Sequence, residues 1–278
     1  FRSGVSINDK TVNSTRYDSK TASLKYANVF NLANIIMNGS AGLDQKIDAR
    51  RQLQSLFATA QLGYNEFVYL DLSARNDWSS TLAYTSHEKS GFFYPSVGFS
   101  LIFNKLMTLP QWVSLAKIRG AYSMVGNDIP MFITNPSSHI TAGGEFLASD
   151  AAPFKDMEPE MTHSFEAGIE ARFLKNRIGL NATFYKTNTR NQFFKLPTLS
   201  GDKYAYRYVN AGDIQNVGWE ISLDAVPLLT NHFKWKTEVN FSTNRNKIIS
   251  LHEALKEFLY GPTSFSSSYA MKLVKGGS

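Results

Sequence analysis

The sequence predicts an all-β fold, an antiparallel up-and-down sheet of the transmembrane β-barrel type. Three observations predict this fold class. Apolar and polar residues alternate with a period of two in eight stretches, the apolar side of each stretch carries no charged residue, and short connections alternate with long ones along the chain. A period of two is that of a strand, because successive side chains of a strand point to opposite faces.

The segment HSFEAGIEARFLKNRIGLNATFYKTNTR, residues 163–190, shows the pattern most clearly. Every second residue from Phe165 to Phe173 is apolar, whereas Glu166 and Arg172 are among those between them. The same alternation gives eight strands in four hairpins: 55–64 with 68–75, 93–103 with 116–124, 165–173 with 178–185, and 217–225 with 233–241. The opposite faces hold twelve charged residues: Asp71, Arg75, Lys117, Arg119, Glu166, Glu170, Arg172, Glu220, Asp224, Lys234, Lys236 and Glu238. Residues 1–50 are left without an assignment.

The connections distinguish a membrane barrel from a soluble sandwich. Links inside the hairpins are mostly short (NE, LKNR, PLLTNH and the longer 104–114), while those between hairpins are long (77–91, 126–162, 190–213 and from 244 onward). Strict alternation places the short turns at one end of the sheet and the long loops at the other, as in outer-membrane barrels. Aromatic residues also gather near the strand ends, where such barrels carry girdles at the membrane boundaries.

Composition excludes several other classes. No run of 18 apolar residues exists, so spanning by helices is not expected. The net charge of +6 comes from scattered basic residues, which argues against a nucleic-acid surface, and the chain has no cysteine. The five histidines show no metal-ligand spacing, and no nucleophile arrangement or phosphate loop stands out, so no enzyme, metal or cofactor is predicted.

Several stretches, in order along the chain, resemble SusC/RagA-type TonB-dependent outer-membrane transporters. They are LSARNDWSSTL (72–82), YPSVGFSLIF (94–103), LAKIRGAYSMVGND (115–128), MEPEMTHSFEAGIEARFLKNRIGLNATFYKTNTRNQF (157–193), NAGDIQNVGWEISL (210–223) and NFSTNRNKIISL (240–251). The resemblance implies a barrel of 22 strands, of which residues 1–278 form an incomplete C-terminal-half portion of about 8–10 strands with long extracellular loops. No plug domain, TonB box or signal peptide is recognised in the chain, so other segments of the same transporter are expected to complete the sheet.

The resemblance also implies a function, a location and partners. The function is nutrient import, with oligosaccharides or peptides as substrate, in the outer membrane of a Gram-negative bacterium. The implied partners are a SusD-like surface lipoprotein, outer-membrane lipid, and the TonB energy-coupling complex acting through a plug. Nucleic acid is not an expected partner.

Aromatic residues of the long loops are the candidate contacts to substrate or to the lipoprotein lid: Trp78, Tyr84, Phe132, Phe146, Tyr204, Tyr206, Tyr208, Tyr260 and Phe265. An aromatic face stacks on the apolar face of a sugar ring, and a polar tip suits a wet boundary. Packing of loop on loop is the other interpretation. Glycines within the strands (Gly120, Gly126, Gly168 and Gly218) leave room for close approach of a plug or substrate, or for packing between strands.

Two rival folds remain at this point. A small, self-closed eight-stranded barrel would act as an anchor or adhesin, and a soluble β-sandwich would bind carbohydrate. A closed barrel pairs its first strand with its last. A sandwich covers the uncharged face with a second layer of the same chain.

Overall fold

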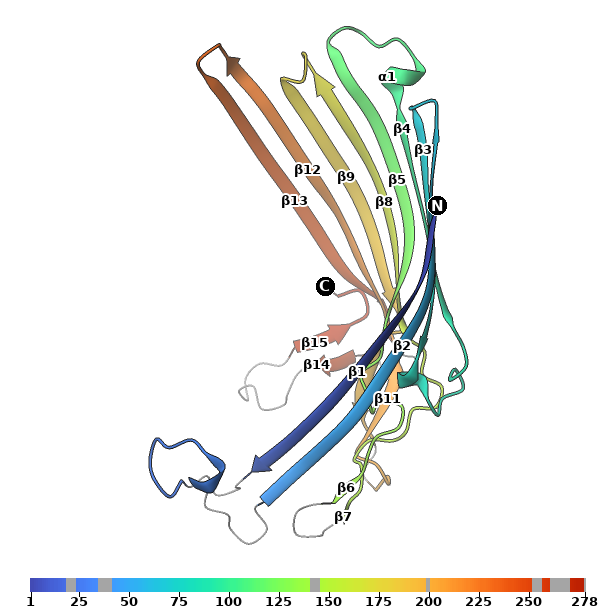
Figure 1. The fold of residues 1–278 in the computed structure, drawn as a ribbon, viewed down its shortest axis with the longest axis vertical. Helices are drawn as coiled ribbons and strands as arrows, with labels where there is room; N and C mark the ends of the chain where they lie inside the picture. The colour runs from blue at the N-terminus through green and yellow to red at the C-terminus, as the bar shows by residue number, and fades with distance from the viewer. Residues whose placement is uncertain are drawn as a thin grey trace.

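The computed structural model describes residues 1–18, 24–34, 42–140, 146–198, 201–251, 257–260 and 271–277. Nine strands form one antiparallel sheet in the order β1-β2-β3-β4-β5-β8-β9-β12-β13. Their bounds are β1 (Arg2–Asp18), β2 (Gly42–Tyr64), β3 (Val68–Ser79), β4 (Phe92–Ile102), β5 (Val113–Asn127), β8 (Glu160–Phe173), β9 (Ile178–Arg190), β12 (Asp213–Leu229) and β13 (Lys234–Ser250). The sheet curves as an open wall, with short turns at one end and the long loops at the other (Figure 1).

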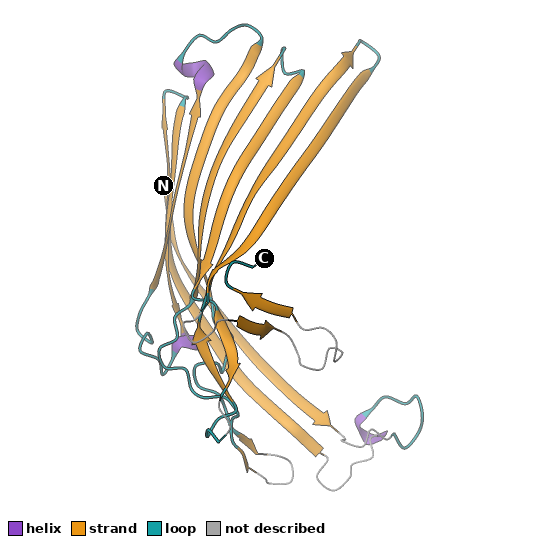
Figure 2. Ribbon diagram, turned by 180° about the vertical axis from the view of Figure 1, so that it is seen from behind, coloured by secondary structure: helices purple, strands orange, loops and turns teal. Residues whose placement is uncertain are grey.

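Smaller elements lie in the connections. The two-stranded sheets are β6 (His139–Ile140) with β7 (Phe146–Leu147), β10 (Phe193–Pro197) with β11 (Tyr206–Asn210), and β14 (Glu257–Tyr260) with β15 (Met271–Val274). The helical turns are η1 (Leu32–Asn34), η2 (Ser80–Leu82) and α1 (Phe103–Leu106). Within the described residues, no helix is long and apolar enough to cross a membrane. Figure 2 shows α1 at the short-turn end of the wall and the other small elements toward the long-loop end.

The four predicted hairpins are present with the predicted pairing of strands. The structure adds a ninth strand, because β1 and the first part of β2 occupy much of the N-terminal segment that the pattern leaves unassigned. Strand β13 runs on to Ser250, beyond the predicted end at 241, and Phe103 begins α1 rather than ending β4. Polar residues continue these strands past the alternating part, so hydrophobic periodicity underestimates their length.

The register keeps the uncharged side chains on one face across the sheet. Ile169, for example, lies opposite Ile118 on β5 and Ala182 on β9, and Ile221 lies opposite Ala182 and Phe241. Directly opposed residues share a face. The charged residues predicted for the other side therefore share the opposite face of the wall, called the inner face here.

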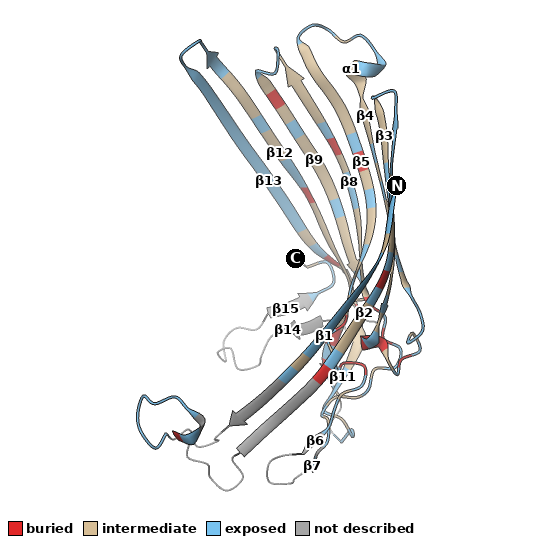
Figure 3. Cartoon of the chain, in the orientation of Figure 1, coloured by how far each residue is buried: buried red, intermediate tan, exposed pale blue. Residues whose placement is uncertain are grey.

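None of the described residues forms a second layer over the uncharged face. Phe99, Ile169, Val239 and Leu56 on this face are 50%, 46%, 58% and 53% exposed. Figure 3 shows little burial along the wall and more at its long-loop end. The strands β1 and β13 are the two edges of the sheet and do not pair with each other. The wall is thus an incomplete barrel, and neither a closed eight-stranded barrel nor a sandwich describes it.

Glycines of the wall accommodate neighbouring side chains. A Cβ on Gly120 would lie 2.5 Å from the ring of Phe99, and one on Gly218 would lie 2.5 Å from the ring of Tyr185. A ring lying over a glycine of the next strand covers backbone that would otherwise be bare. At these positions, packing between strands accounts for the glycine.

Candidate functional site

The inner face of the wall carries a connected row of charges. Glu170 lies 3.8 Å from Lys117 of β5 and 4.0 Å from Arg172, whose guanidinium is 3.7 Å from Asp224 of β12. Arg119 Nη2 donates a hydrogen bond to Thr183 Oγ1 at 2.6 Å, so this guanidinium is held by a neutral partner. Exposed ion pairs contribute little to stability. Their value here is a hydrated, polar inner surface of the kind that lines an aqueous passage.

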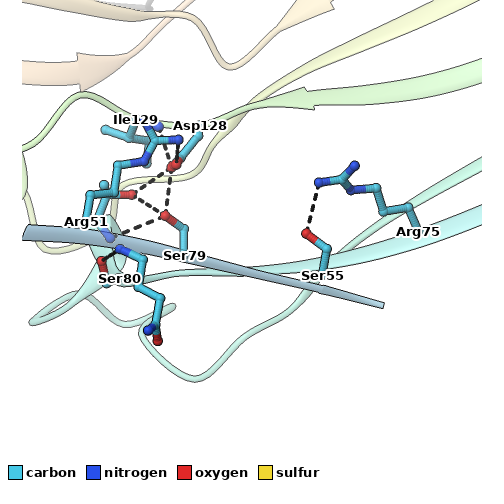
Figure 4. A network of polar contacts seen from close by, with 9 residues as sticks. Arg51, Ser55, Arg75, Ser79, Ser80, Asp128 and Ile129 are labelled. Carbon is cyan, nitrogen blue, oxygen red and sulfur yellow. Dashed lines mark hydrogen bonds and ion pairs between the residues drawn. The ribbon is translucent and has the colours of Figure 1, made fainter. Parts of the chain in front are cut away.

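A buried carboxylate fastens two long loops to the wall (Figure 4). Asp128, directly after β5, accepts through Oδ1 from Ser79 Oγ at 2.9 Å, Thr81 Oγ1 at 2.8 Å and its neighbour's N–H at 2.7 Å. Its Oδ2 forms an ion pair with Arg51 of β2 and accepts no further hydrogen bond. The side chain is only 16% exposed, so this charge depends on those partners.

The loop platform is the set of described residues in 80–91, 128–159 and 191–212. Its loops bond to one another: the Ser86 N–H donates to the Lys155 carbonyl at 2.9 Å, and Asn210 Nδ2 donates to the Glu158 carbonyl at 2.8 Å. The platform has its own core of Leu82, Ile129, Ile133 and Met157, all buried, with Phe92, Phe154, Phe193 and Tyr208 packed around it. The long loops therefore form one folded unit.

Two hollows lie at this end of the molecule. The larger, of about 490 Å³, is lined by polar wall residues that include Arg75, Asp77, Tyr94 and Ser96, and by Asp128 of the platform. Arg75 Nε donates to Asp77 Oδ1 at 2.6 Å, and Arg75 Nη2 donates to Ser55 Oγ at 2.9 Å. These groups give one side of the hollow a polar lining, while apolar residues such as Leu53, Phe92 and Val125 line the rest.

The smaller hollow, of about 320 Å³, brings together two of the predicted aromatic residues. Tyr84 and Phe132 both line it, from different loops, next to Arg50 of β2. Tyr84 is 73% exposed and Phe132 is 43% exposed, and both have a left-handed backbone with φ of 67°. That conformation costs roughly 1–2 kcal/mol for a residue other than glycine. Such strain is found at ligand-binding sites, where the surrounding structure holds it in place.

The other predicted aromatics are dispersed over the long-loop end. Trp78 is the next-to-last residue of β3 and is 40% exposed, and Phe146 in β7 is 65% exposed. Lys195 Nζ lies 4.0 Å from the ring centroid of Tyr206, which occupies one face of that ring.

The four remaining candidates are Tyr204, Tyr208, Tyr260 and Phe265. Tyr208 is half-buried against the platform core, and Tyr204 is also half-buried. Tyr260 lies in β14, and Phe265 lies outside the described residues. The proposed contacts of these residues with substrate or lid stay predictions.

Sequence reasoning missed Arg51 and Asp128, which organise the platform. Asp128 ends the stretch LAKIRGAYSMVGND, which carries part of the family resemblance, so a signal was present. No such signal marks Arg51, because it precedes the alternating stretch that begins at Ser55.

Comparisons with known proteins agree with this architecture. The family model described as TonB dependent receptor-like, beta-barrel matches residues 4–256. TonB-dependent receptor P39 of Formosa agariphila is 25% identical over 235 residues, which are 81% of this chain and 22% of that protein. TonB-dependent receptor SusC of Bacteroides thetaiotaomicron is 25% identical over 227 residues, 73% of this chain and 22% of that protein.

Solved structures give the same result for the fold. The RagAB peptide transporter superposes with a TM-score of 0.72 at 20% identity, over 91% of this chain and 28% of that chain. The open-open state of the RagAB peptide importer gives 0.71 at 23% identity, over 84% of this chain and 26% of that chain. The chain spans about a fifth of the length of the curated relatives it matches. Since the family model covers most of its residues, the chain belongs to the TonB dependent receptor-like β-barrel family.

Proposed function

We propose that this chain supplies wall and outer loops to a SusC/RagA-type importer in the outer membrane of a Gram-negative bacterium. One observation carries the proposal: nine strands keep an uncovered apolar face outside and a charged face inside, with the long loops knitted together at one end. The outer face meets lipid and the inner face borders water. The work is gated translocation, in which no bond of the cargo is made or broken.

The cargo in this proposal is an oligosaccharide or a peptide, captured with a SusD-like lipoprotein and moved with energy from the TonB complex. The relatives support this class, since one is named SusC and another is described as a peptide importer. Tyr84 and Phe132 contribute to capture, because two exposed rings held in a strained backbone flank one hollow beside Arg50. The hollow between these rings has a volume of about 320 Å³. This is at the small end of the range for ligand pockets, so the hollow would hold part of a larger cargo.

Ligand retention by the full-length transporter, with and without its lipoprotein, tests the proposal. The purified complex is exposed to a panel of oligosaccharides and to a tryptic peptide mixture, and retained molecules are identified by mass spectrometry. One class is expected to be retained. Because each ring contributes about 0.5–1.5 kcal/mol, the double variant Y84A/F132A should bind about tenfold more weakly.

The matched control is F233A, which removes an exposed aromatic ring at the short-turn end, 57% exposed in the structure. It should bind like the unaltered transporter. Retention of neither class by the complex contradicts the proposed function. Loss of the lipoprotein in Y84A/F132A, with cargo binding by the transporter alone unchanged, assigns the two rings to the lid instead.

A further inference from the structure

The outer face of the wall changes from apolar to basic near the long-loop end of strands β8, β9, β12 and β13. The register defines two rows across these strands. One row contains Phe165, Lys186, Val217 and Arg245, and the next row toward the loops contains His163, Asn188, Gln215 and Lys247. The row on the other side, with Ala167, Phe184, Trp219 and Thr243, carries no charge. A set of cations therefore borders the apolar band.

These cations project outward and not into the passage. Lys186 lies opposite Phe165 and Val217, and Arg245 lies opposite Val217 from the other side. Opposed residues share a face, and Phe165 and Val217 belong to the uncharged one. Lys247 is two residues beyond Arg245 on the same strand, so it projects to the same side.

Among the described residues, none forms an ion pair with these cations. Lys186 lies on β9, and Arg245 and Lys247 lie on β13, an edge strand of the sheet. All three are exposed, and no hydrogen bond holds them within the described residues. At the outward positions of these four strands, all of which the structure describes, Asp213 is the sole carboxylate. Its two oxygens accept hydrogen bonds from Arg190 Nε at 3.3 Å and from Asn188 Nδ2 at 2.7 Å. Lys186, Arg245 and Lys247 are called the basic patch below.

The spacing of the basic patch suits one small anion. Strands β9 and β13 are separated only by β12, so the Cα atoms of Lys186 and Arg245 are about 10 Å apart. Two long side chains converging from that distance can hold a single phosphate between them. Their aliphatic stems cover apolar surface of the wall while the charged heads reach the boundary of the hydrocarbon.

On the opposite half of the wall, the described side chains form no such patch. At the same boundary on β2 and β3 the outward residues Gln54 and Asn76 are neutral. Arg50 is held there by Asp9, which accepts from Arg50 Nε at 2.9 Å and 3.0 Å through its two oxygens. Among the outward positions of the described strands, unpaired positive charge is thus confined to one side of the wall.

We propose that the basic patch binds the phosphate-bearing headgroup of a lipid in the leaflet on the long-loop side. A cation at the edge of the apolar band is attracted electrostatically to an anionic lipid headgroup at the same depth in the membrane. The site is part of the lipid-facing surface and is separate from the passage for cargo. It rests on the membrane setting of the barrel family and does not depend on nutrient import.

Selectivity for spin-labelled lipids tests the site in the full-length transporter. The protein is reconstituted in phosphatidylcholine bilayers containing a trace of spin-labelled phosphatidic acid or phosphatidylcholine, and electron paramagnetic resonance measures the motionally restricted fraction. The transporter should prefer the phosphatidic acid by about fivefold or more, as expected from one cation near an anionic surface. K186Q/R245Q/K247Q should lose most of this preference, and K186R/K247R should keep it.

The control K175Q/K234Q/K236Q removes the same number of charges from the short-turn end and the inner face. It should keep the preference, whereas high salt should weaken it. Each variant is first checked for native strand content by circular dichroism. An unchanged preference in K186Q/R245Q/K247Q overturns the site, as does an equal loss in the control. The site is also overturned if K186R/K247R loses as much of the lipid preference as K186Q/R245Q/K247Q does. A further contrary result is that inorganic phosphate displaces the spin-labelled phosphatidic acid and the spin-labelled phosphatidylcholine equally.

Discussion

The wall and the loop platform solve the folding problem in different ways. The wall is a single layer whose apolar residues remain uncovered, with Val239 and Phe241 each 58% exposed. The platform buries Leu82, Ile129 and Met157 almost completely, at 1%, 1% and 0% exposure. Burying a side chain of this size stabilises by about 1.5–3 kcal/mol. The platform thus has a protein core, whereas the wall requires lipid to cover its apolar face.

The polar contacts of the wall are also more exposed to solvent than those of the platform. On the inner face of the wall, the pairs around Glu170 are 3.7–4.0 Å long and partly exposed. In the platform, Asp128 has three donors on one oxygen and Arg51 on the other. Solvated pairs can be changed one at a time at small cost, but a buried charge that loses its partners is strongly destabilising. The wall should tolerate polar substitutions inside, and the platform should not.

The largest expected effect comes from placing a charge on the outer face of the wall. Ile221→Arg puts a guanidinium in the middle of the apolar band and should lower the free energy of unfolding in bilayers by about 2–4 kcal/mol. Ser222→Arg, one residue further on the same strand, projects into the hydrated passage and should change it by less than about 1 kcal/mol. Reversible denaturation of the full-length protein in lipid vesicles measures both. Equal effects would contradict the assignment of the two faces.

The same contrast explains what the sequence could predict. The wall was predictable because each strand repeats a period of two, and one slip in register would move every apolar side chain to the other face. The faces of Ile169 and Glu170 were assigned correctly from this pattern alone. The family resemblance supplied the incomplete barrel, which the alternation by itself left open.

The platform was not predictable in the same way. Its core combines Leu82, Ile129 and Met157 from separate loops, and no period in the sequence relates such positions. Aromatic content did single out Tyr84 and Phe132, but their shared hollow depends on two left-handed residues, a conformation that neither side chain favours. Strand β1 and the first part of β2 were missed, because β1 is largely polar and its strand periodicity is weak.

An intermediate effect is expected from the carboxylate that fastens the platform. Asp128→Ala removes three accepted hydrogen bonds and leaves Arg51 without its partner. Local opening of residues 80–91 should become easier by about 1–3 kcal/mol, with little change in the strands. Hydrogen exchange of the full-length protein measures this as faster exchange in the loops alone. Asp128→Asn keeps one carbonyl acceptor and should give a smaller effect. Equal acceleration in β8 and β9 would show that platform and wall unfold together.

The smallest expected effect lies at the short-turn end and depends on pH. Glu66 lies in the turn between β2 and β3, where its Oε2 accepts a hydrogen bond from Lys105 Nζ of α1 at 2.7 Å. This hydrogen bond lowers the pKa of Glu66 below its ordinary value of 4.5. A carboxyl whose pKa is lower in the folded state stabilises the protein above its unfolded-state pKa, and that stabilisation is lost as the pH falls through the folded-state pKa.

Melting temperatures at pH 7 and pH 3 compare the unaltered protein with Glu66→Gln. The unaltered protein should melt slightly higher at pH 7, and the difference should shrink as the pH is lowered and Glu66 takes up a proton. Both side chains of the pair are well exposed, at 56% for Lys105 and 74% for Glu66, so water and salt screen their attraction. The platform does not contact this turn, so hydrogen exchange in its loops should be unaffected. A difference that grows at pH 3 would contradict the pairing.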